Sequence, residues 1–74
     1  MPIVFTDHAK KQLKERHISQ KRAGETVSNP QAILPSFKNR RLRRRRFGAK
    51  ILEAVTVTEG SKITVITSYY LKRK

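Results

Sequence analysis

Residues 50–71, with the sequence KILEAVTVTEGSKITVITSYYL, decide the fold. Two runs rich in β-branched residues, 50–58 and 61–71, flank a Glu-Gly pair that is typical of a tight turn. The stretch therefore predicts an antiparallel β-hairpin. Strict alternation along its second strand predicts one face that holds Ile63, Val65, Thr67 and Tyr69.

The segments before this hairpin predict further strands. Residues 2–5 form a short apolar run that is long enough for an edge strand, and residues 32–34 form another, which Pro35 confines to an edge or a bulge. Residues 40–47 are a polar strand or loop, and Gly48 returns the chain towards the hairpin. The second half of the chain is therefore expected to be mostly β.

Helical spacing and capping residues predict two helices, at about 7–16 and 19–28. Thr6 or Asp7 offers an N-cap for the first helix, whose apolar residues recur every four positions. Ser19 caps the second helix, and an Asn-Pro pair ends it. The sequence thus predicts an α+β fold, with two N-terminal helices packed on a curved antiparallel sheet of three to four strands, in a single domain over residues 1–74.

The composition restricts the class of partner. Eighteen Lys and Arg against five Asp and Glu give a net charge of +13 in 74 residues. Leu, Ile, Val and Phe account for 19 residues, enough for a small core, so the chain is expected to fold. No cysteine is present, which fits a reducing, cytoplasmic location, and no apolar run approaches the length of a membrane span. The composition therefore predicts an anionic partner, and no association with a membrane is expected.

The most basic segment, residues 38–46, has seven cations in nine positions. Neighbouring like charges repel, but a polyanion offsets that repulsion, and arginine offers paired donors to phosphate. The alternative is a solvated loop or a localisation tract. The expected nucleic-acid-binding residues, including two on the first helix, are Lys38, Arg40, Arg41, Arg43, Arg44, Arg45, Arg46, Lys10 and Lys14.

Four residues are candidates for catalysis. His8 and Arg16 share one side of the first helix with Gln12, and a His beside an Arg can serve phosphodiester cleavage, with His8 transferring a proton and Arg16 holding phosphate. Tyr69 and Tyr70 point to opposite faces, so one can belong to the core while the other stacks on a base or donates a proton. His8 could instead be a structural residue. The five acidic residues are scattered, so no metal site is expected, nor any small-molecule cofactor.

The order and spacing of several short motifs resemble a known family. They are Phe5-Thr6-x-His8-Ala9, Leu13-x-Glu15-Arg16-x-Ile18-Ser19 and Val27-x-Asn29-Pro30, followed by a basic strand, Gly48 and two closing strands. The pattern resembles small bacterial proteins classed as a domain of unknown function, and is similar to the RelE/ParE toxin superfamily. Gln12 and His17 depart from that pattern, because the family often has Arg and Gly there.

This resemblance implies a function. RelE-like members cleave mRNA, often on the ribosome, using basic residues and a C-terminal tyrosine, whereas ParE-like members inhibit gyrase. The expected function is therefore that of a metal-independent, toxin-type endoribonuclease. Its expected partners are RNA, including mRNA on the ribosome, and an acidic antitoxin protein. A nucleic-acid-binding module without catalysis and a ParE-like toxin that inhibits a protein target are the alternatives.

Overall fold

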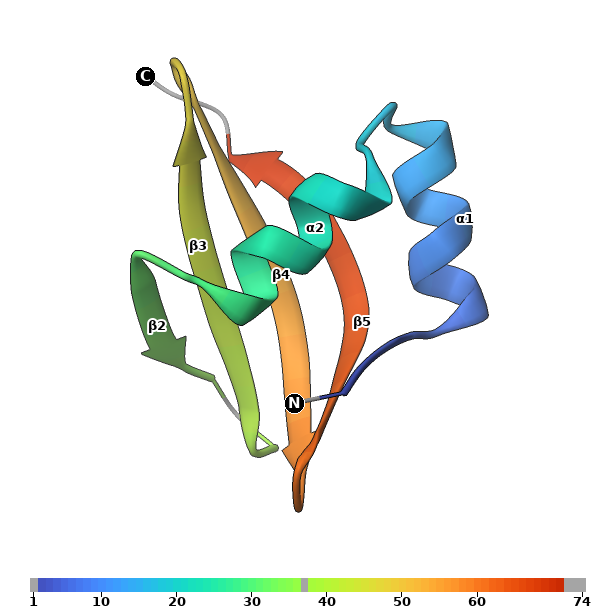
Figure 1. Cartoon of the computed structure of the whole chain (residues 1–74), viewed down its shortest axis with the longest axis vertical. Helices are drawn as coiled ribbons and strands as arrows, with labels where there is room; N and C mark the ends of the chain where they lie inside the picture. The colour runs from blue at the N-terminus through green and yellow to red at the C-terminus, as the bar shows by residue number, and fades with distance from the viewer. Residues whose placement is uncertain (1, 37, 72–74) are drawn as a thin grey trace.

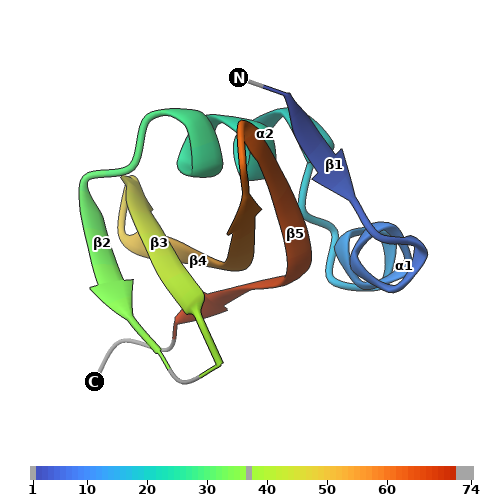
Figure 2. The same ribbon diagram turned by 90° about the horizontal axis from the view of Figure 1, so that it is seen from below.

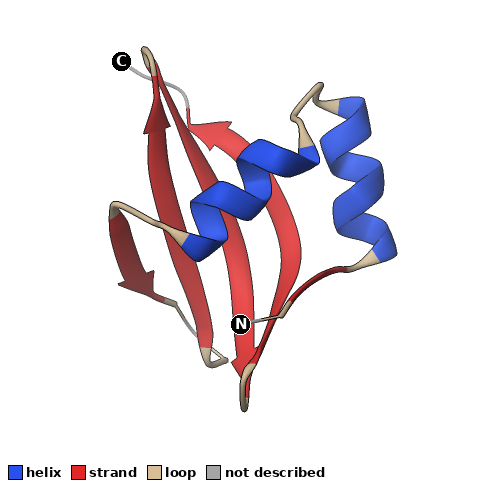
Figure 3. Ribbon diagram, viewed as in Figure 1, coloured by secondary structure: helices blue, strands red, loops and turns tan. Residues whose placement is uncertain are grey.

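The computed structural model describes residues 2–36 and 38–71, which form two helices and five strands. The order along the chain is β1 (Ile3–Phe5), α1 (Asp7–Glu15), α2 (Gln20–Ser28), β2 (Ala32–Pro35), β3 (Arg40–Phe47), β4 (Lys50–Glu59) and β5 (Lys62–Leu71). Figure 1 shows α2 crossing one face of the sheet, with α1 beside β5. The strands and helices are coloured separately in Figure 3.

Side-chain caps define where each helix begins. Thr6 Oγ1 accepts a hydrogen bond from the N–H of Ala9 at 3.0 Å, and Ser19 Oγ accepts one from the N–H of Arg22 at the same distance. Each cap satisfies one of the N–H groups that a helix start leaves without a partner. The predicted helices are confirmed to within a residue at each end, and Asn29 ends the second one as expected.

The sheet differs from the expected one. It has five strands in the order β1-β5-β4-β3-β2, and β1 runs parallel to β5, so the sheet is mixed. The prediction of three to four antiparallel strands is therefore wrong. Both short edge strands expected from the sequence join this one sheet: β1 pairs its three residues with Ile63–Val65, and β2 pairs with β3. Seen from below, the sheet curves around α2 (Figure 2).

A bulge in β5 divides that strand into two halves with opposite alternation. Thr56 of β4 pairs with Val65, and Val55 pairs with Thr67, so Ile66 is the extra residue. An extra residue shifts every following side chain to the other face of the sheet. The expectation that Val65 and Tyr69 share a face is therefore wrong: Val65 is buried beneath the helices, whereas Tyr69 lies on the opposite face.

The core lies between the helices and one face of the sheet, in two adjoining clusters. One joins both helices to β4 and β5 and holds Ala9, Val27, Ala54, Ile63 and Val65. The other lies beneath the junction of α1 and α2 and holds Leu13, Ile18, Ala23 and Leu52. Among the described residues no helix covers the other face of the sheet, which we call the open face.

Candidate functional site

The arginine-rich segment is a strand, so its cations divide between the two faces of the sheet. In β3, Arg41, Arg43 and Arg45 lie on the helix side, and Arg40, Arg44 and Arg46 lie on the open face. The seven cations therefore do not form one continuous surface. Their roles differ according to face.

On the helix side, two of these arginines bond to the end of α2. Arg43 is only 9% exposed, and its Nη1 donates to the Val27 carbonyl at 3.1 Å while its Nε donates to Thr56 Oγ1 at 3.2 Å. Arg45 Nη1 donates to the Asn29 carbonyl at 2.9 Å. Burial, together with the charge of Arg41, lowers the pKa of Arg43. The guanidinium groups of Arg43 and Arg45 thus hold α2 on the sheet, and the nucleic-acid interface expected from the sequence is revised to exclude them.

On the open face, three neighbouring strands contribute a row of bonded polar side chains. Arg44, Glu53 and Tyr69 are register partners on β3, β4 and β5. Arg44 Nε donates to Glu53 Oε1 at 2.5 Å, and the Tyr69 hydroxyl donates to Glu53 Oε2. We call this set, together with Arg16 of α1, the arginine–glutamate–tyrosine row.

The electrostatics of the row follow from its degree of burial. Glu53 is 3% exposed and both of its oxygens accept hydrogen bonds, so the carboxylate reaches solvent only through its neighbours. Burial first, then the hydrogen bond to Glu53 and its negative charge, raise the pKa of Tyr69 to about 12. Arg44 and Arg16 act in the opposite direction. Tyr69 is therefore neutral at physiological pH and donates a hydrogen bond to Glu53.

Helix α1 adds its own side chains at the edge of β5. β1 covers only the first half of that edge, and α1 lies along the remainder. Gln12 accepts a hydrogen bond from the Thr67 hydroxyl, and Arg16 Nη1 donates to the Ser68 carbonyl at 2.8 Å. The Arg16 guanidinium lies 6.0 Å from the centre of the Tyr69 ring, within the range of a cation–π contact. Arg16 therefore completes the row.

His8 is not part of this row. It is exposed and shares a side of α1 with Gln12 and Arg16. Eight residues separate His8 from Arg16, which is about 12 Å along the helix axis. The structure brings Arg16, and not His8, to the tyrosine.

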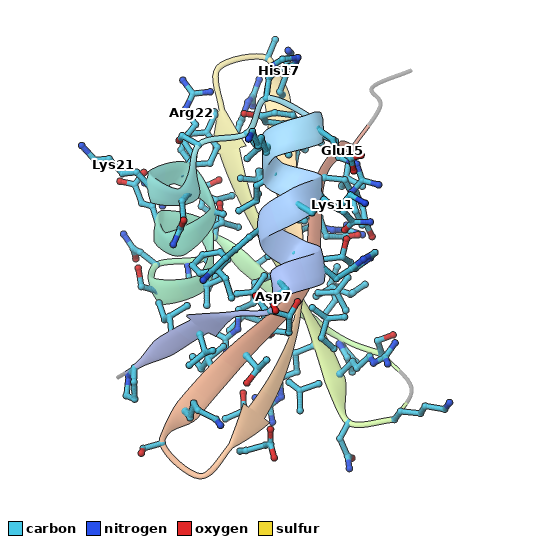
Figure 4. All side chains as sticks on the ribbon, turned by 90° about the vertical axis from the view of Figure 1, so that its right-hand side faces the viewer. Asp7, Lys11, Glu15, His17, Lys21 and Arg22 are labelled. Atoms are coloured by element: carbon cyan, nitrogen blue, oxygen red, sulfur yellow. The ribbon has the colours of Figure 1, made fainter. Side chains whose placement is uncertain are left out.

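The two lysines of α1 lie on its other flank. Lys10 and Lys14 are each two residues from Gln12, which is about 200° around the helix, so they point away from the open face. Both are exposed. Figure 4 shows the outward surface of α1, where Asp7, Lys11 and Glu15 lie. The acidic residues of α1 are thus kept apart from the row.

Tyr70 is separated from Tyr69 by the sheet itself. It packs against the second core cluster, and its hydroxyl accepts a hydrogen bond from Arg22 Nη1 at 3.2 Å. Lys50 Nζ lies 5.2 Å from the centre of its ring. Of the two predicted tyrosines, Tyr69 is on the open face and Tyr70 supports the helix side.

The remaining predicted cations lie at the two ends of β3. Lys38 is exposed in the turn between β2 and β3, with a φ of 61°, and Arg40 and Arg41 follow it at the start of the strand. Arg46 is exposed near the other end, where its Nε donates to the Gly48 carbonyl at 2.9 Å.

Comparison of the sequence with known protein families gives a match that covers nearly the whole chain. The family described as "Domain of unknown function (DUF4258)" matches residues 5–70, from β1 to β5. The chain belongs to the DUF4258 family. Neither the comparison with curated proteins nor that with solved structures gave a match.

In this DUF4258 domain, Glu53 is the site residue that sequence reasoning missed. It was grouped with the scattered acids, yet it is the only charged residue between Ile51 and Thr58, in a run that is otherwise apolar or threonine. A lone carboxylate inside an apolar strand must be paired if it is buried. That isolation is the signal that could have found it.

Two further properties of the DUF4258 domain apply to residues 2–36 and 38–71. No helix there is both long and apolar enough to cross a membrane. In the same part of the chain, no group of three His, Asp or Glu side chains lies close enough together to hold a metal ion.

Proposed function

We propose that this domain is an RNA-binding, toxin-type endoribonuclease that works on the open face of its sheet. The observation that carries the proposal is the pairing of the half-buried Tyr69 hydroxyl with the buried Glu53 carboxylate, between the guanidinium groups of Arg44 and Arg16. This arrangement places a proton acceptor, a proton carrier and two cations in one row. Those are the groups that phosphodiester cleavage requires.

The chemistry can be written from these groups. A ribose 2′-hydroxyl attacks the adjacent phosphorus, and the bond from phosphorus to the 5′ oxygen of the next nucleotide breaks. The 2′-hydroxyl gives its proton to the Tyr69 oxygen while Tyr69 passes its own proton to Glu53, so the carboxylate is the base. The departing 5′ oxygen takes a proton from water, which leaves a 2′,3′-cyclic phosphate and a 5′-hydroxyl. The hydroxide so formed takes the proton held by Glu53, by way of Tyr69, and the carboxylate is restored.

The other members of the row stabilise charge. A negative charge accumulates on the phosphate oxygens as the new bond forms, and Arg16 and Arg44 lie on either side of Tyr69 and Glu53 to meet it. The raised pKa of Tyr69, about 12, keeps the phenol protonated before the reaction, so it acts as a carrier and not as a standing base. His8 lies about 12 Å from Arg16 along the axis of α1, so it takes no part in this proton transfer, and its proposed role is contact with RNA.

Charge and resemblance support RNA as the substrate class. The net charge of +13 favours a polyanion, and Arg40, Arg44 and Arg46 place part of that charge on the open face. The motifs of α1 and α2 resemble those of the RelE/ParE superfamily. The proposal therefore extends to a cytoplasmic toxin that is neutralised by an acidic antitoxin and acts on mRNA, including mRNA on the ribosome.

A second candidate is a nucleic-acid-binding module without catalysis. The observation that favours it is that both carboxylate oxygens of Glu53 already accept hydrogen bonds, one from Arg44 and one from Tyr69. A carboxylate so occupied can simply hold three strands in register. The two candidates share the RNA ligand and differ only in whether Glu53 receives a proton.

Substitution of the base tests the proposal. Glu53→Gln keeps one acceptor oxygen, which can serve Arg44, and replaces the other with an amide N–H that can donate to the Tyr69 oxygen. It removes the basic oxygen, so cleavage of labelled RNA is expected to fall by about 100-fold or more with binding nearly unchanged. Glu59→Gln, an exposed residue at the end of the same strand, is the matched control and is expected to cleave normally.

The wild-type assay is run with and without EDTA. Cleavage that EDTA does not affect supports the proposal. An RNA-binding protein that never cleaves is instead the non-catalytic module, and cleavage that EDTA abolishes contradicts the metal-independent mechanism. Melting curves of each variant show whether the fold is intact.

A further inference from the structure

The two arginines at the start of β3 differ from the four that follow. Each later arginine bonds to a protein group: Arg43 to Val27 and Thr56, Arg44 to Glu53, Arg45 to Asn29 and Arg46 to Gly48. By contrast, the guanidinium groups of Arg40 and Arg41 make no hydrogen bond or ion pair with any group in residues 2–36 or 38–71. Within the described residues their ten N–H donors have no partner.

Both of these arginines line one pocket. It has a volume of about 440 Å³ and lies where β2 turns into β3, bounded by Pro35, Ser36, Asn39, Arg40, Arg41 and Thr58. Although Arg40 and Arg41 point to opposite faces of the sheet, the strand begins here, so the pocket extends around its end.

The turn beside the pocket holds the start of the strand in place. Lys38 and Asn39 both have left-handed backbone conformations, with φ of 61° and 60°. The N–H of Ser36 donates to the Arg40 carbonyl at 2.9 Å across the hairpin. The backbone position of both arginines is thereby fixed before a ligand arrives, which reduces the ordering cost of binding.

The lining suits a doubly charged phosphate. Two guanidinium groups supply a charge of +2, and the hydroxyls of Ser36 and Thr58 and the amide of Asn39 supply neutral donors. No Asp or Glu lines the pocket, and Glu59, which follows Thr58, is exposed outside it. A phosphate monoester carries a charge of about −1.5 to −2 at neutral pH and has three acceptor oxygens, whereas a diester within a chain carries only one charge.

We propose that this pocket binds the terminal phosphate monoester of an RNA strand whose body lies on the open face. The proposal rests on the proposed function for its ligand. Arg40 precedes Arg44 by four residues, which is about 13 Å along the strand, so one RNA strand can reach both the pocket and the arginine–glutamate–tyrosine row. The pocket then fixes the position of the cut relative to one end of the RNA.

The test uses RNA that cannot be cleaved. Short 2′-O-methyl oligonucleotides with a 5′-phosphate, a 3′-phosphate or only hydroxyl ends are compared by fluorescence anisotropy. One of the two phosphorylated forms is expected to bind about tenfold or more tightly than the hydroxyl form, as loss of charge-assisted hydrogen bonds costs at least that. Inorganic phosphate at millimolar concentration is expected to abolish this difference in affinity, because it competes for the same pocket.

Matched variants identify the residue responsible. Arg41→Gln is expected to remove the preference for a terminal phosphate while the hydroxyl form still binds, because the Arg41 side chain supports nothing else in the described residues. Arg45→Gln removes the same charge from the same strand and is expected to keep the preference, because that guanidinium is bonded to Asn29. Melting curves confirm that both variants fold.

Three outcomes overturn the inference. Equal binding of all three oligonucleotides, or a preference that survives Arg41→Gln, refutes the pocket and leaves RNA binding on the open face intact. Failure of the wild-type protein to bind any RNA refutes both the pocket and the proposed function.

Discussion

The two faces of the sheet are built from the same three long strands, yet their polar side chains are used differently. On the helix side, Arg43 and Arg45 donate to backbone carbonyls at the end of α2, and Arg22 donates to Tyr70. On the open face, Arg44, Glu53 and Tyr69 bond to one another across the strands, and Arg16 joins α1 to this face by donating to the Ser68 carbonyl of β5. The role of a polar side chain therefore depends on the face of the sheet on which it lies, more than on the strand that carries it.

Tyr69 and Tyr70 show this contrast most simply. They are neighbours in sequence, but one lies beside Glu53 and Arg16 while the other packs under the helix junction. The bulge at Ile66 determines which tyrosine lies on which face. The contrast can be broken by shifting the second half of β5 by one residue, and sharpened by measurements that act on one face at a time.

Insertion of one alanine between Thr67 and Ser68 is expected to have the largest effect. One added residue moves every following side chain to the other face, so Tyr69 would enter the core and Ser68 and Tyr70 would move to the open face. The loss should approach the whole stability of a domain of this size, about 5 kcal/mol or more. Circular dichroism during heating measures it. Deletion of Ile66 is the control, because it removes the extra residue and leaves the pairs of Thr56 with Val65 and of Val55 with Thr67 on their present faces, so it is expected to lose much less. Equal melting of the two variants would show that the register of β5 does not set the faces.

Replacement of the buried arginine comes next. Arg43→Met keeps the length of the side chain but removes the donors to Val27 and Thr56, so the free energy of unfolding should fall by about 2 kcal/mol or more. Arg46→Met, at an exposed position of the same strand, should change it by no more than about 0.5 kcal/mol. Urea titration of both variants gives the comparison, and similar losses would contradict the division of β3 into two faces.

Titration of Tyr69 gives a smaller effect that isolates the open face. Its pKa is raised from 10.0 to about 12, so between these two pH values the unfolded chain has lost a proton that the folded chain retains. The stabilisation from this group is complete below pH 10 and is lost as the pH rises towards 12. Absorbance at high pH should show a phenol ionising near pH 12 that is missing in Tyr69→Phe. Ionisation of that phenol at its ordinary pKa would mean that Glu53 does not hold it.

Much of the fold could be predicted because its signals are local. The caps Thr6 and Ser19 and the Asn29-Pro30 stop act within a few residues, so both helices follow from their own segments. The strand at residues 40–47 is one of the two forms that this segment was expected to take, and alternation along it places Arg43 and Arg44 on opposite faces.

The errors have non-local causes. β1 contributes only three residues to a parallel pairing with a strand about 60 positions away, which no pattern in either segment specifies. Ile66 has the same β propensity as its neighbours, so nothing in its own segment marks it as the bulge. The row could not be assembled from the sequence either, because Arg16, Arg44, Glu53 and Tyr69 come from four different elements whose register had to be known.

The central claim is that the open face is the working face, and a pair of conservative substitutions tests it most directly. Tyr69→Phe and Tyr70→Phe each remove one hydroxyl from adjacent positions, and both are assayed for cleavage of the same labelled RNA. The account predicts that Tyr69→Phe slows cleavage by about 10²–10⁴ with RNA binding nearly unchanged, because the proton route to Glu53 is lost. It predicts that Tyr70→Phe cleaves at close to the wild-type rate. Cleavage that depends equally on both hydroxyls, or on Tyr70 alone, would contradict it.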